Sequence, residues 1–150
     1  ARMRFDLTIS EFTRELGMGK KLLVYDENTW RPYCHVSDIS DAIIQIIRLS
    51  PKSVGRQIFN VGGDENNYTK KMIVDIINKY VDEPDIEYKT MGSDPRNYRV
   101  SFKKAREILR FEPVFSAEES IRSLLQAIDN QLFTHIEERR NFYGNYQVNE

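Results

Sequence analysis

The sequence predicts an α/β fold. Short apolar runs typical of strands alternate with longer segments in which apolar residues recur every three or four positions, as on one face of a helix. The chain has 150 residues, about the length of one domain, and 40% of them are hydrophobic, which is enough for a core. We find no internal repeat and no linker, so we expect one folded unit over residues 1–136 and a polar, loosely held tail at residues 137–150.

The first third of the chain predicts one helix and two extended pieces. Apolar residues at helical spacing predict a helix over residues 6–17, where glycines end it. Residues 22–25 are a short apolar run, and residues 30–36 are a second extended piece after an acidic turn. These two pieces predict either a hairpin or a loop–strand unit.

The next two segments are unusually apolar. Residues 38–49 predict a helix that Ser37 or Asp38 can cap and that carries isoleucines on more than one face. Residues 57–61 form a compact apolar strand that ends at paired glycines. Both patterns are typical of elements buried on more than one side. Because the chain offers few other strands to complete a sheet, we expect it to pack against a segment outside this sequence.

The remaining elements follow from local signals. A helical pattern spans residues 73–81, and alternating residues at 86–89 predict an exposed or edge strand. A loop over residues 91–99 leads to a short helix within 101–109, which the serine at its start can cap. The last helix has the clearest start, because residues 116–119 match a capping box.

The composition excludes several functional classes. Twenty-two Lys and Arg against 23 Asp and Glu give a formal net charge of -1. The chain therefore lacks the excess of positive charge that is typical of a nucleic-acid-binding protein. No apolar run approaches the ~18 to 20 residues that span a membrane. One cysteine cannot form an internal disulfide, and together with two histidines it supplies too few ligands for structural zinc. We therefore expect a cytoplasmic protein without nucleic-acid, membrane or metal partners.

Arginines in the loops are the most conspicuous polar feature. Their planar guanidinium groups can converge on a phosphate or diphosphate and bind it bidentately. The alternative is a set of solvated charges paired with Asp26, Asp38 or Asp94. The arginines outside the predicted helices are Arg2, Arg4, Arg31, Arg96 and Arg99.

The segment before residue 38 carries other reactive side chains. We interpret His35 as structural, because no carboxylate or nucleophile stands at a recognisable catalytic spacing from it. Cys34 is interpreted as a small buried residue rather than a nucleophile. The Trp30–Tyr33 pair fits packing and stacking on a ligand ring equally well.

Two motifs of NAD enzymes are absent from the sequence. Gly17-Met18-Gly19 continues with two lysines, and Gly62-Gly63 lacks a third glycine, so no dinucleotide-binding loop is present. None of the tyrosines has a lysine four residues later, so a tyrosine base with its lysine neighbour is also missing. We predict no catalytic residue and no cofactor site in this chain.

Four stretches nevertheless occur in a recognisable order, namely Arg2–Leu7, Trp30–Ile39, Ile58–Gly62 and Asp94–Pro113. This series resembles the carboxy-terminal half of the extended short-chain dehydrogenase/reductases, the NAD-dependent sugar-nucleotide epimerases and dehydratases. The resemblance covers roughly residues 2–128.

The resemblance implies the carboxy-terminal part of a Rossmann-type fold with a small mixed α/β substrate-binding region. In that family an amino-terminal half holds NAD and the catalytic Tyr-x-x-x-Lys, and the carboxy-terminal half grips the nucleotide diphosphate of the sugar. Residues 58–62 would then be a late parallel strand of the Rossmann sheet, and the helix at 38–49 would pack against it.

The resemblance also assigns roles to individual residues. It implies that Arg31 contacts the diphosphate and that Arg96 closes on the nucleotide from the other side. Arg4 and Tyr33 are the remaining candidate substrate-binding residues.

Two departures from the family pattern leave the sugar and the base open: Pro32 stands where aspartate is common, and Ser10 stands where asparagine is common. We predict that the chain binds a nucleotide-diphosphate sugar and is catalytic only with an upstream NAD-binding half, or that it forms a homo-oligomer. NAD would belong to the complete enzyme and not to this chain alone. The alternatives are a non-catalytic binding or assembly module and an unrelated small α/β binding domain.

Overall fold

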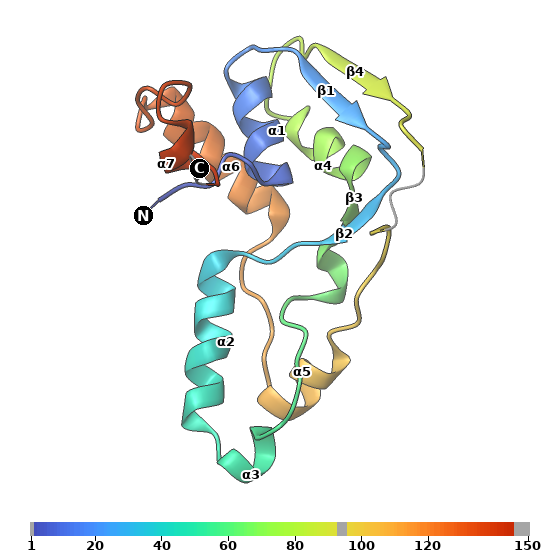
Figure 1. Ribbon diagram of the computed structural model, residues 1–150, viewed down its shortest axis with the longest axis vertical. Coiled ribbons are helices and arrows are strands. Elements are labelled where there is room, and N and C mark those ends of the chain that lie inside the picture. The colour runs from blue at the N-terminus through green and yellow to red at the C-terminus, as the bar shows by residue number, and fades with distance from the viewer. Residues whose placement is uncertain (1, 93–95, 146–150) are drawn as a thin grey trace, which may run out of the picture.

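The computed structural model describes residues 2–92 and 96–145, except for the side chain of residue 140. Its elements alternate along the chain and form an upper and a lower part in Figure 1. The elements are α1 (Thr8–Gly17), β1 (Leu22–Tyr25), β2 (Trp30–Pro32), α2 (Val36–Arg48), α3 (Pro51–Val54), the 3-10 turn η1 (Asp64–Asn66), β3 (Asn67–Thr69), α4 (Lys70–Ile77), β4 (Ile86–Lys89), α5 (Lys103–Leu109), α6 (Ala117–Asp129) and α7 (Arg140–Tyr143).

The upper part contains a parallel pair of strands covered by helices. β1 pairs with β4 in parallel, with Leu22 opposite Ile86 and Val24 opposite Tyr88. Leu22 and Val24 point into the main core, which α1, α4 and α6 also supply. The hairpin expected as one arrangement of residues 22–36 is not formed, because β1 pairs with a distant strand; the loop–strand arrangement is the one observed.

The second sheet links the upper part to the lower part. β2 pairs antiparallel with β3, and Arg31 lies opposite Tyr68. The Tyr33 backbone N–H extends this pairing by donating to the carbonyl oxygen of Asn66 at 2.9 Å. Because β3 leads directly into α4, the main core fixes the position of β2.

The lower part has a small core and a large exposed apolar face. Ala42, Ala105, Leu109 and Phe111 are buried there, and residues of the 57–61 segment pack against them. The strand expected at residues 57–61 is not formed among the described residues. A strand is stable only when a neighbouring strand takes up its backbone hydrogen bonds, and no described strand lies beside this segment.

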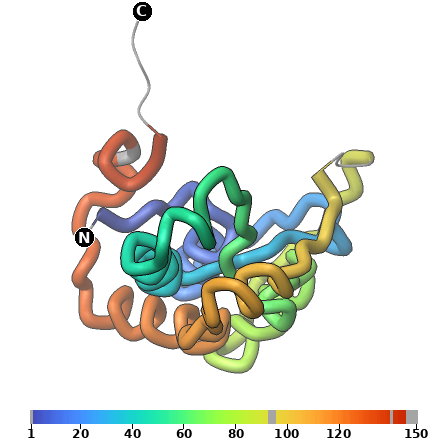
Figure 2. Tube along the Cα trace, turned by 90° about the horizontal axis from the view of Figure 1, so that it is seen from below, coloured from blue at the N-terminus to red at the C-terminus, as the bar shows by residue number. Residues whose placement is uncertain are grey.

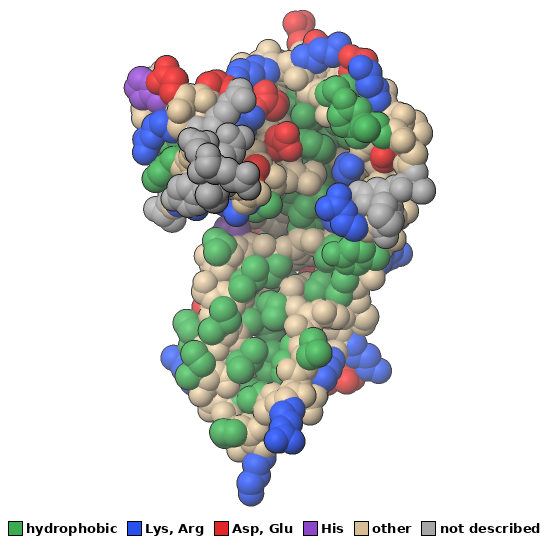
Figure 3. Space-filling model, in the orientation of Figure 1, with side chains coloured by type: hydrophobic (Ala, Val, Ile, Leu, Met, Phe, Trp, Pro, Cys, Tyr) green, Lys and Arg blue, Asp and Glu red, His purple; other side chains and the backbone are tan. Residues whose placement is uncertain are grey.

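The helix expected at residues 38–49 is also less buried than its sequence predicts. Only Asp38 and Ala42 of α2 are buried, while Ile43 is 52% and Ile47 is 77% exposed. Figure 3 shows hydrophobic side chains gathered over this half of the molecule. The isoleucine-rich α2, whose composition suits burial on several sides, is therefore largely exposed to solvent in this chain.

The start of α2 differs from both expected caps. The helix begins at Val36, and the Nδ1 atom of His35 accepts a hydrogen bond from the Ser37 backbone N–H at 3.2 Å. Asp38 lies inside the first turn instead. Its buried carboxylate accepts from the backbone N–H groups of Val114 at 2.9 Å and Phe115 at 3.2 Å, which ties α2 to the chain that leads into α6.

Serine caps were predicted for the helices that the structure shows as α5 and α6. The capping box of α6 is confirmed, with reciprocal bonds between Ser116 and Glu119. The helix predicted to start at Ser101 begins at Lys103 as α5, with Phe102 at its N-cap, but the Ser101 hydroxyl still accepts from the Lys103 backbone N–H at 3.4 Å. The helix expected over residues 73–81 starts earlier, as α4, and ends at Ile77.

Within the segment expected to be a loose tail, residues 140–143 form α7. Tyr143 is buried beside Phe5, and the backbone N–H of Phe5 donates to the Tyr143 carbonyl oxygen at 2.7 Å. The division of the chain at residue 136 stays a prediction.

Candidate functional site

Cationic and aromatic side chains gather on β2 and on the segment 96–99, which we call the β2 cluster (Trp30, Arg31, Arg96, Tyr98 and Arg99). The Arg31 guanidinium donates to the carbonyl oxygen of Arg96 and, at 2.8 Å, to that of Trp30. It also lies over the Tyr98 ring, 5.7 Å from the centroid. The Arg99 guanidinium lies 4.6 Å from the centroid of the Trp30 ring. Two guanidinium–ring pairs, Arg31 with Tyr98 and Arg99 with Trp30, therefore join β2 to the segment 96–99.

Asparagine side chains hold the segment 96–100 against the second sheet. The Oδ1 atom of Asn97 accepts from the Trp30 backbone N–H at 2.9 Å. Asn67 of β3 is buried, and its amide bonds both the N–H and the carbonyl oxygen of Val100, at 2.8 and 3.0 Å. These contacts bring residues far apart in sequence to one place without a continuous strand ladder.

A carboxylate secures the next part of the same segment. Asp64 accepts from the Phe102 backbone N–H at 3.0 Å and from the Arg106 guanidinium at 2.7 Å. The hydrogen bond from Phe102 and then the one from Arg106 lower the pKa of Asp64. The chain between the cluster and α5 is thus anchored at both ends.

The two other candidate residues have different surroundings. Tyr33 follows β2 and packs against the main core, and burial raises the pKa of its hydroxyl, an effect that nearby Thr8 and Arg31 oppose. Arg4 lies in the amino-terminal segment, where its guanidinium binds the Asp6 carboxylate at 2.6 and 2.5 Å. Arg31 and Arg96 meet in the β2 cluster, Tyr33 stands next to it in sequence, and Arg4 has its main contacts elsewhere.

The segment between β2 and α2 has a structural role. Burial, with a further contribution from Asp38, raises the pKa of the Cys34 thiol to about 11, so the thiol stays protonated and is a poor nucleophile at neutral pH. His35 caps α2 and stacks on Phe115 with ring centroids 4.3 Å apart. Cys34 is half-buried rather than buried as expected, and both observations agree with a structural role for these residues.

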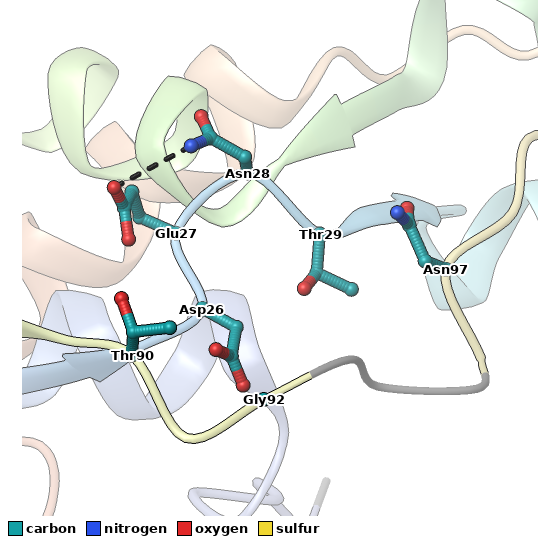
Figure 4. Close-up of a pocket in the computed structure, with 7 residues that line it drawn as sticks. All are labelled: Asp26, Glu27, Asn28, Thr29, Thr90, Gly92 and Asn97. Atoms are coloured by element: carbon teal, nitrogen blue, oxygen red, sulfur yellow. Dashed lines mark hydrogen bonds between the residues drawn. The ribbon is translucent and has the colours of Figure 1, made fainter.

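A shallow hollow of about 220 Å³ lies beside the cluster, between the turn at residues 26–29 and the segments around Thr90 and Asn97 (Figure 4). Its described lining includes the carboxylates of Asp26 and Glu27 and no lysine or arginine. Carboxylates repel a doubly charged phosphate group. The described lining of this hollow therefore disfavours an anion.

The described residues contain neither a group of three or more His, Cys, Asp or Glu side chains that could hold a metal ion nor a helix long and apolar enough to cross a membrane. Asp26, one of the expected arginine partners, instead accepts from the Met91 backbone N–H at 2.9 Å. Asp94, another expected partner, lies outside the described residues.

Sequence reasoning missed the residues that position the arginines. Asn67, Asn97 and Asp64 act through backbone groups of a distant segment, and no local spacing marks such contacts. For Asn67 the sequence offered one signal, namely an amide side chain within a short strand-like segment. A buried amide in such a place needs hydrogen-bond partners from elsewhere in the fold.

Comparison with solved structures finds the same fold in larger enzymes. One is dTDP-glucose 4,6-dehydratase from Bacillus anthracis in complex with NAD, at 27% identity and a TM-score of 0.68, with 85% of this chain and 40% of that chain covered. Another is UDP-glucose 4-epimerase with UDP-glucose from Thermotoga maritima, at 22% identity and a TM-score of 0.68, over 85% of this chain and 40% of that one. A third is UDP-glucuronic acid 4-epimerase from Bacillus cereus in complex with UDP-glucuronic acid and NAD, at 17% identity and a TM-score of 0.72, over 87% of this chain and 41% of that one.

These similarities confirm the resemblance to the carboxy-terminal part of the extended short-chain dehydrogenase/reductases and the mixed α/β fold class. This chain spans about two fifths of the length of the enzymes it matches. No protein-family model matches the chain.

Proposed function

We propose that this chain, which has the fold of the carboxy-terminal part of an extended short-chain dehydrogenase/reductase, is the nucleotide-sugar-binding portion of an NAD-dependent sugar-nucleotide epimerase or dehydratase. The observation that carries the proposal is the contact between the Arg31 guanidinium and the backbone of Arg96, which joins residues 65 positions apart. The family resemblance predicts that both arginines contact the diphosphate.

Electrostatics favours the β2 cluster as the place where the diphosphate binds. A diphosphate carries at least two negative charges, and a chain with a net charge of -1 attracts it only through locally placed cations. β2 and the segment 96–99 carry such cations at Arg31, Arg96 and Arg99, and the Arg31 guanidinium contacts the backbone of Arg96. Each bidentate contact to a charged group contributes ~1.5 to 3 kcal/mol.

The paired glycines Gly62 and Gly63 do not fit the diphosphate of NAD. A dinucleotide-binding loop needs glycines whose open Cβ positions let the diphosphate approach the backbone. At Gly62 a Cβ atom would meet the Phe102 ring at 2.8 Å, and at Gly63 it would meet the Glu65 carboxylate. An aromatic ring and a negative charge therefore occupy that space. NAD and the catalytic base would come from an NAD-binding half upstream, and the chain would be catalytic only together with it.

The exposed face of α2 supports the need for such a partner. Ile43, Ile47 and Ile58 are more than half exposed, and apolar surface left in water forfeits ~25 cal/mol per Å². The partner that we propose is the NAD-binding half, whose sheet would also take up the backbone of residues 57–61. A second copy of this chain is the competing occupant, and sedimentation of the isolated chain as a defined homodimer would favour it.

The proposal is tested by titrating UDP-glucose and dTDP-glucose, as probes, into the chain in a calorimeter. Arg31→Ala and Arg96→Ala should each weaken binding about tenfold or more, which corresponds to ~1.4 kcal/mol. Lysine at either position should restore only part of the affinity, because an ammonium group cannot make the fork contact. Arg48→Ala, at an exposed position on α2, is the matched control and should bind as the wild type does.

Different outcomes would overturn different parts of the proposal. Normal binding by both alanine variants would exclude a diphosphate site at Arg31 and Arg96. Saturable NAD binding by the isolated chain would contradict the assignment of the cofactor to another half. If neither nucleotide sugar binds, with or without an NAD-binding half, the chain is a non-catalytic assembly module.

A further inference from the structure

The edge of β2 that faces away from β3 lies against the segment 96–100, which is not a strand. The Tyr98 backbone N–H donates to the Trp30 carbonyl oxygen at 3.4 Å. Figures 1 and 2 both show the chain that leads into α5 passing beside β2. Because the backbone groups of successive residues in a strand point to opposite edges, residue 32 faces the same edge as Trp30.

Pro32 interrupts hydrogen bonding along this edge. Proline has no backbone N–H, so β2 offers no donor at residue 32 to a chain that lies beside it. The segment 96–100 therefore needs hydrogen-bond partners other than β2 once it has passed Trp30. Val100, at the end of the segment, is partly buried, and its backbone groups have to be satisfied within the fold.

Asn67 supplies these partners from the neighbouring strand. It lies opposite Pro32 in the pairing of β2 with β3 and is only 6% exposed. Its Oδ1 atom accepts from the Val100 N–H at 2.8 Å, and its Nδ2 atom donates to the Val100 carbonyl oxygen at 3.0 Å. Nδ2 also donates to the Asp64 carbonyl oxygen at 3.0 Å, which orients the amide. An amide side chain carries both a donor and an acceptor, so Asn67 bonds Val100 as the peptide group of a further strand would.

The segment that Asn67 holds carries two of the three arginines of the β2 cluster. Arg99 directly precedes Val100, and its guanidinium lies 4.6 Å from the centroid of the Trp30 ring. Arg96 lies four residues before Val100, and its carbonyl oxygen accepts from the Arg31 guanidinium. The bonds to Val100 therefore limit where Arg96 stands relative to Arg31.

We infer that Asn67 is a positioning residue for diphosphate binding: by holding the Val100 backbone beside Pro32, it keeps Arg96 within reach of the group that Arg31 binds. The inference rests on the proposed function for its ligand. Asn67 is itself buried and bonded to backbone groups, so its effect on affinity passes through Arg96. A ligand binds more tightly to groups that are already in place, because less conformational freedom is lost on binding.

A double-mutant cycle on the whole chain, with UDP as the probe, tests whether Asn67 acts through Arg96. Asn67→Ala should weaken UDP binding about fivefold. Asn67→Ser should weaken it less, because a hydroxyl can bond one of the two Val100 groups. In the Arg96→Ala background, Asn67→Ala should change the affinity by less than about twofold, since the side chain that it positions is gone.

Amide hydrogen exchange without ligand tests the restraint itself. Exchange in residues 96–102 should be about fivefold or more faster in Asn67→Ala than in the wild type, while exchange in α6 stays unchanged. Asn78→Ala is the matched control, because Asn78 lies at the C-cap of α4 and its Oδ1 atom has no hydrogen-bond partner among the described residues. This variant should match the wild type in both measurements.

Equal losses of affinity from Asn67→Ala in the wild-type and Arg96→Ala backgrounds would overturn the inference, because the variant would then weaken the site as a whole. Unaltered UDP affinity or unaltered exchange in residues 96–102 would overturn it too. Should Asn67→Ala not fold, the same cycle with Asn67→Ser decides by the same outcomes. If the wild type itself binds no UDP, the proposed function fails and the positioning role fails with it, whatever the exchange shows.

Discussion

Replacing Asp38 by alanine removes a buried carboxylate that joins two distant parts of the chain. Asp38 is 1% exposed, and its two oxygens accept from the backbone N–H groups of Val114 and Phe115 at 2.9 and 3.2 Å. Alanine cannot accept either bond. The two N–H groups lie in a partly buried connection, where water replaces the lost acceptor only in part.

The expected cost follows from these two bonds. A hydrogen bond to a charged group contributes ~1.5 to 3 kcal/mol, so two of them correspond to roughly 3 to 6 kcal/mol. The donors are partly accessible, so we expect the lower end, about 3 kcal/mol. Asp38→Asn keeps one acceptor oxygen but turns an amide N–H toward the second donor, and it should cost about half as much.

The assay is urea unfolding of the isolated chain, followed by circular dichroism. The unfolding midpoints should fall in the order wild type, Asp38→Asn, Asp38→Ala. Asp41→Ala is the matched control, because Asp41 is exposed on the same helix and its loss changes the net charge equally. Equal midpoints for Asp38→Ala and Asp41→Ala would refute the reasoning, since the two hydrogen bonds would then contribute nothing measurable.

Other expectations concern single groups. Because burial raises the pKa of Cys34 to about 11, its labelling by a disulfide reagent at pH 8 should be roughly a hundredfold slower than that of a free thiol; a rate equal to that of glutathione would contradict this. Ser116→Ala should destabilise the chain by about 1 kcal/mol in thermal unfolding, whereas Ser123→Ala, exposed within the same helix, should not. The Phe102 N–H holds the pKa of the Asp64 carboxyl below its ordinary value. The stability that this hydrogen bond contributes is therefore present above the unfolded-state pKa and is lost as the pH falls through the lowered folded-state pKa. Unfolding measured at about pH 2 to 6 should accordingly depend less on acid in Asp64→Asn than in the wild type.

Local signals in the sequence predicted most helices. The start of α6 could be predicted from Ser116 and Glu119 alone, because both partners of its capping box lie within one turn. The first turn of α2 was misassigned, because the Asp38 carboxylate finds donors more than seventy positions away and is therefore withdrawn from capping. Capping rules describe a helix end only when no distant group competes for the side chain.

Strand pairing and the site depend on contacts that spacing does not encode. Residues 22–25 were recognised as a strand, but only the fold reveals that their partner is the strand at 86–89. The proximity of Arg31 and Arg96 was expected from the family resemblance and not from their spacing. Asn67 could not be predicted as a site residue from the sequence, because its amide holds the backbone of Val100, 33 positions away in a segment that is not a strand.

The proposed binding site and the exposed apolar face lie at the two ends of one continuous stretch. β2 carries Arg31, and α2 begins four residues after β2 ends. His35 caps that helix, and Asp38 fixes its first turn to the connection before α6. A partner that covers Ile43 and Ile47 would therefore pack against a helix whose first turn is fixed and which begins four residues after the strand that carries Arg31. If the proposed partner and diphosphate both bind, their binding would then depend on the one stretch of residues 30–48.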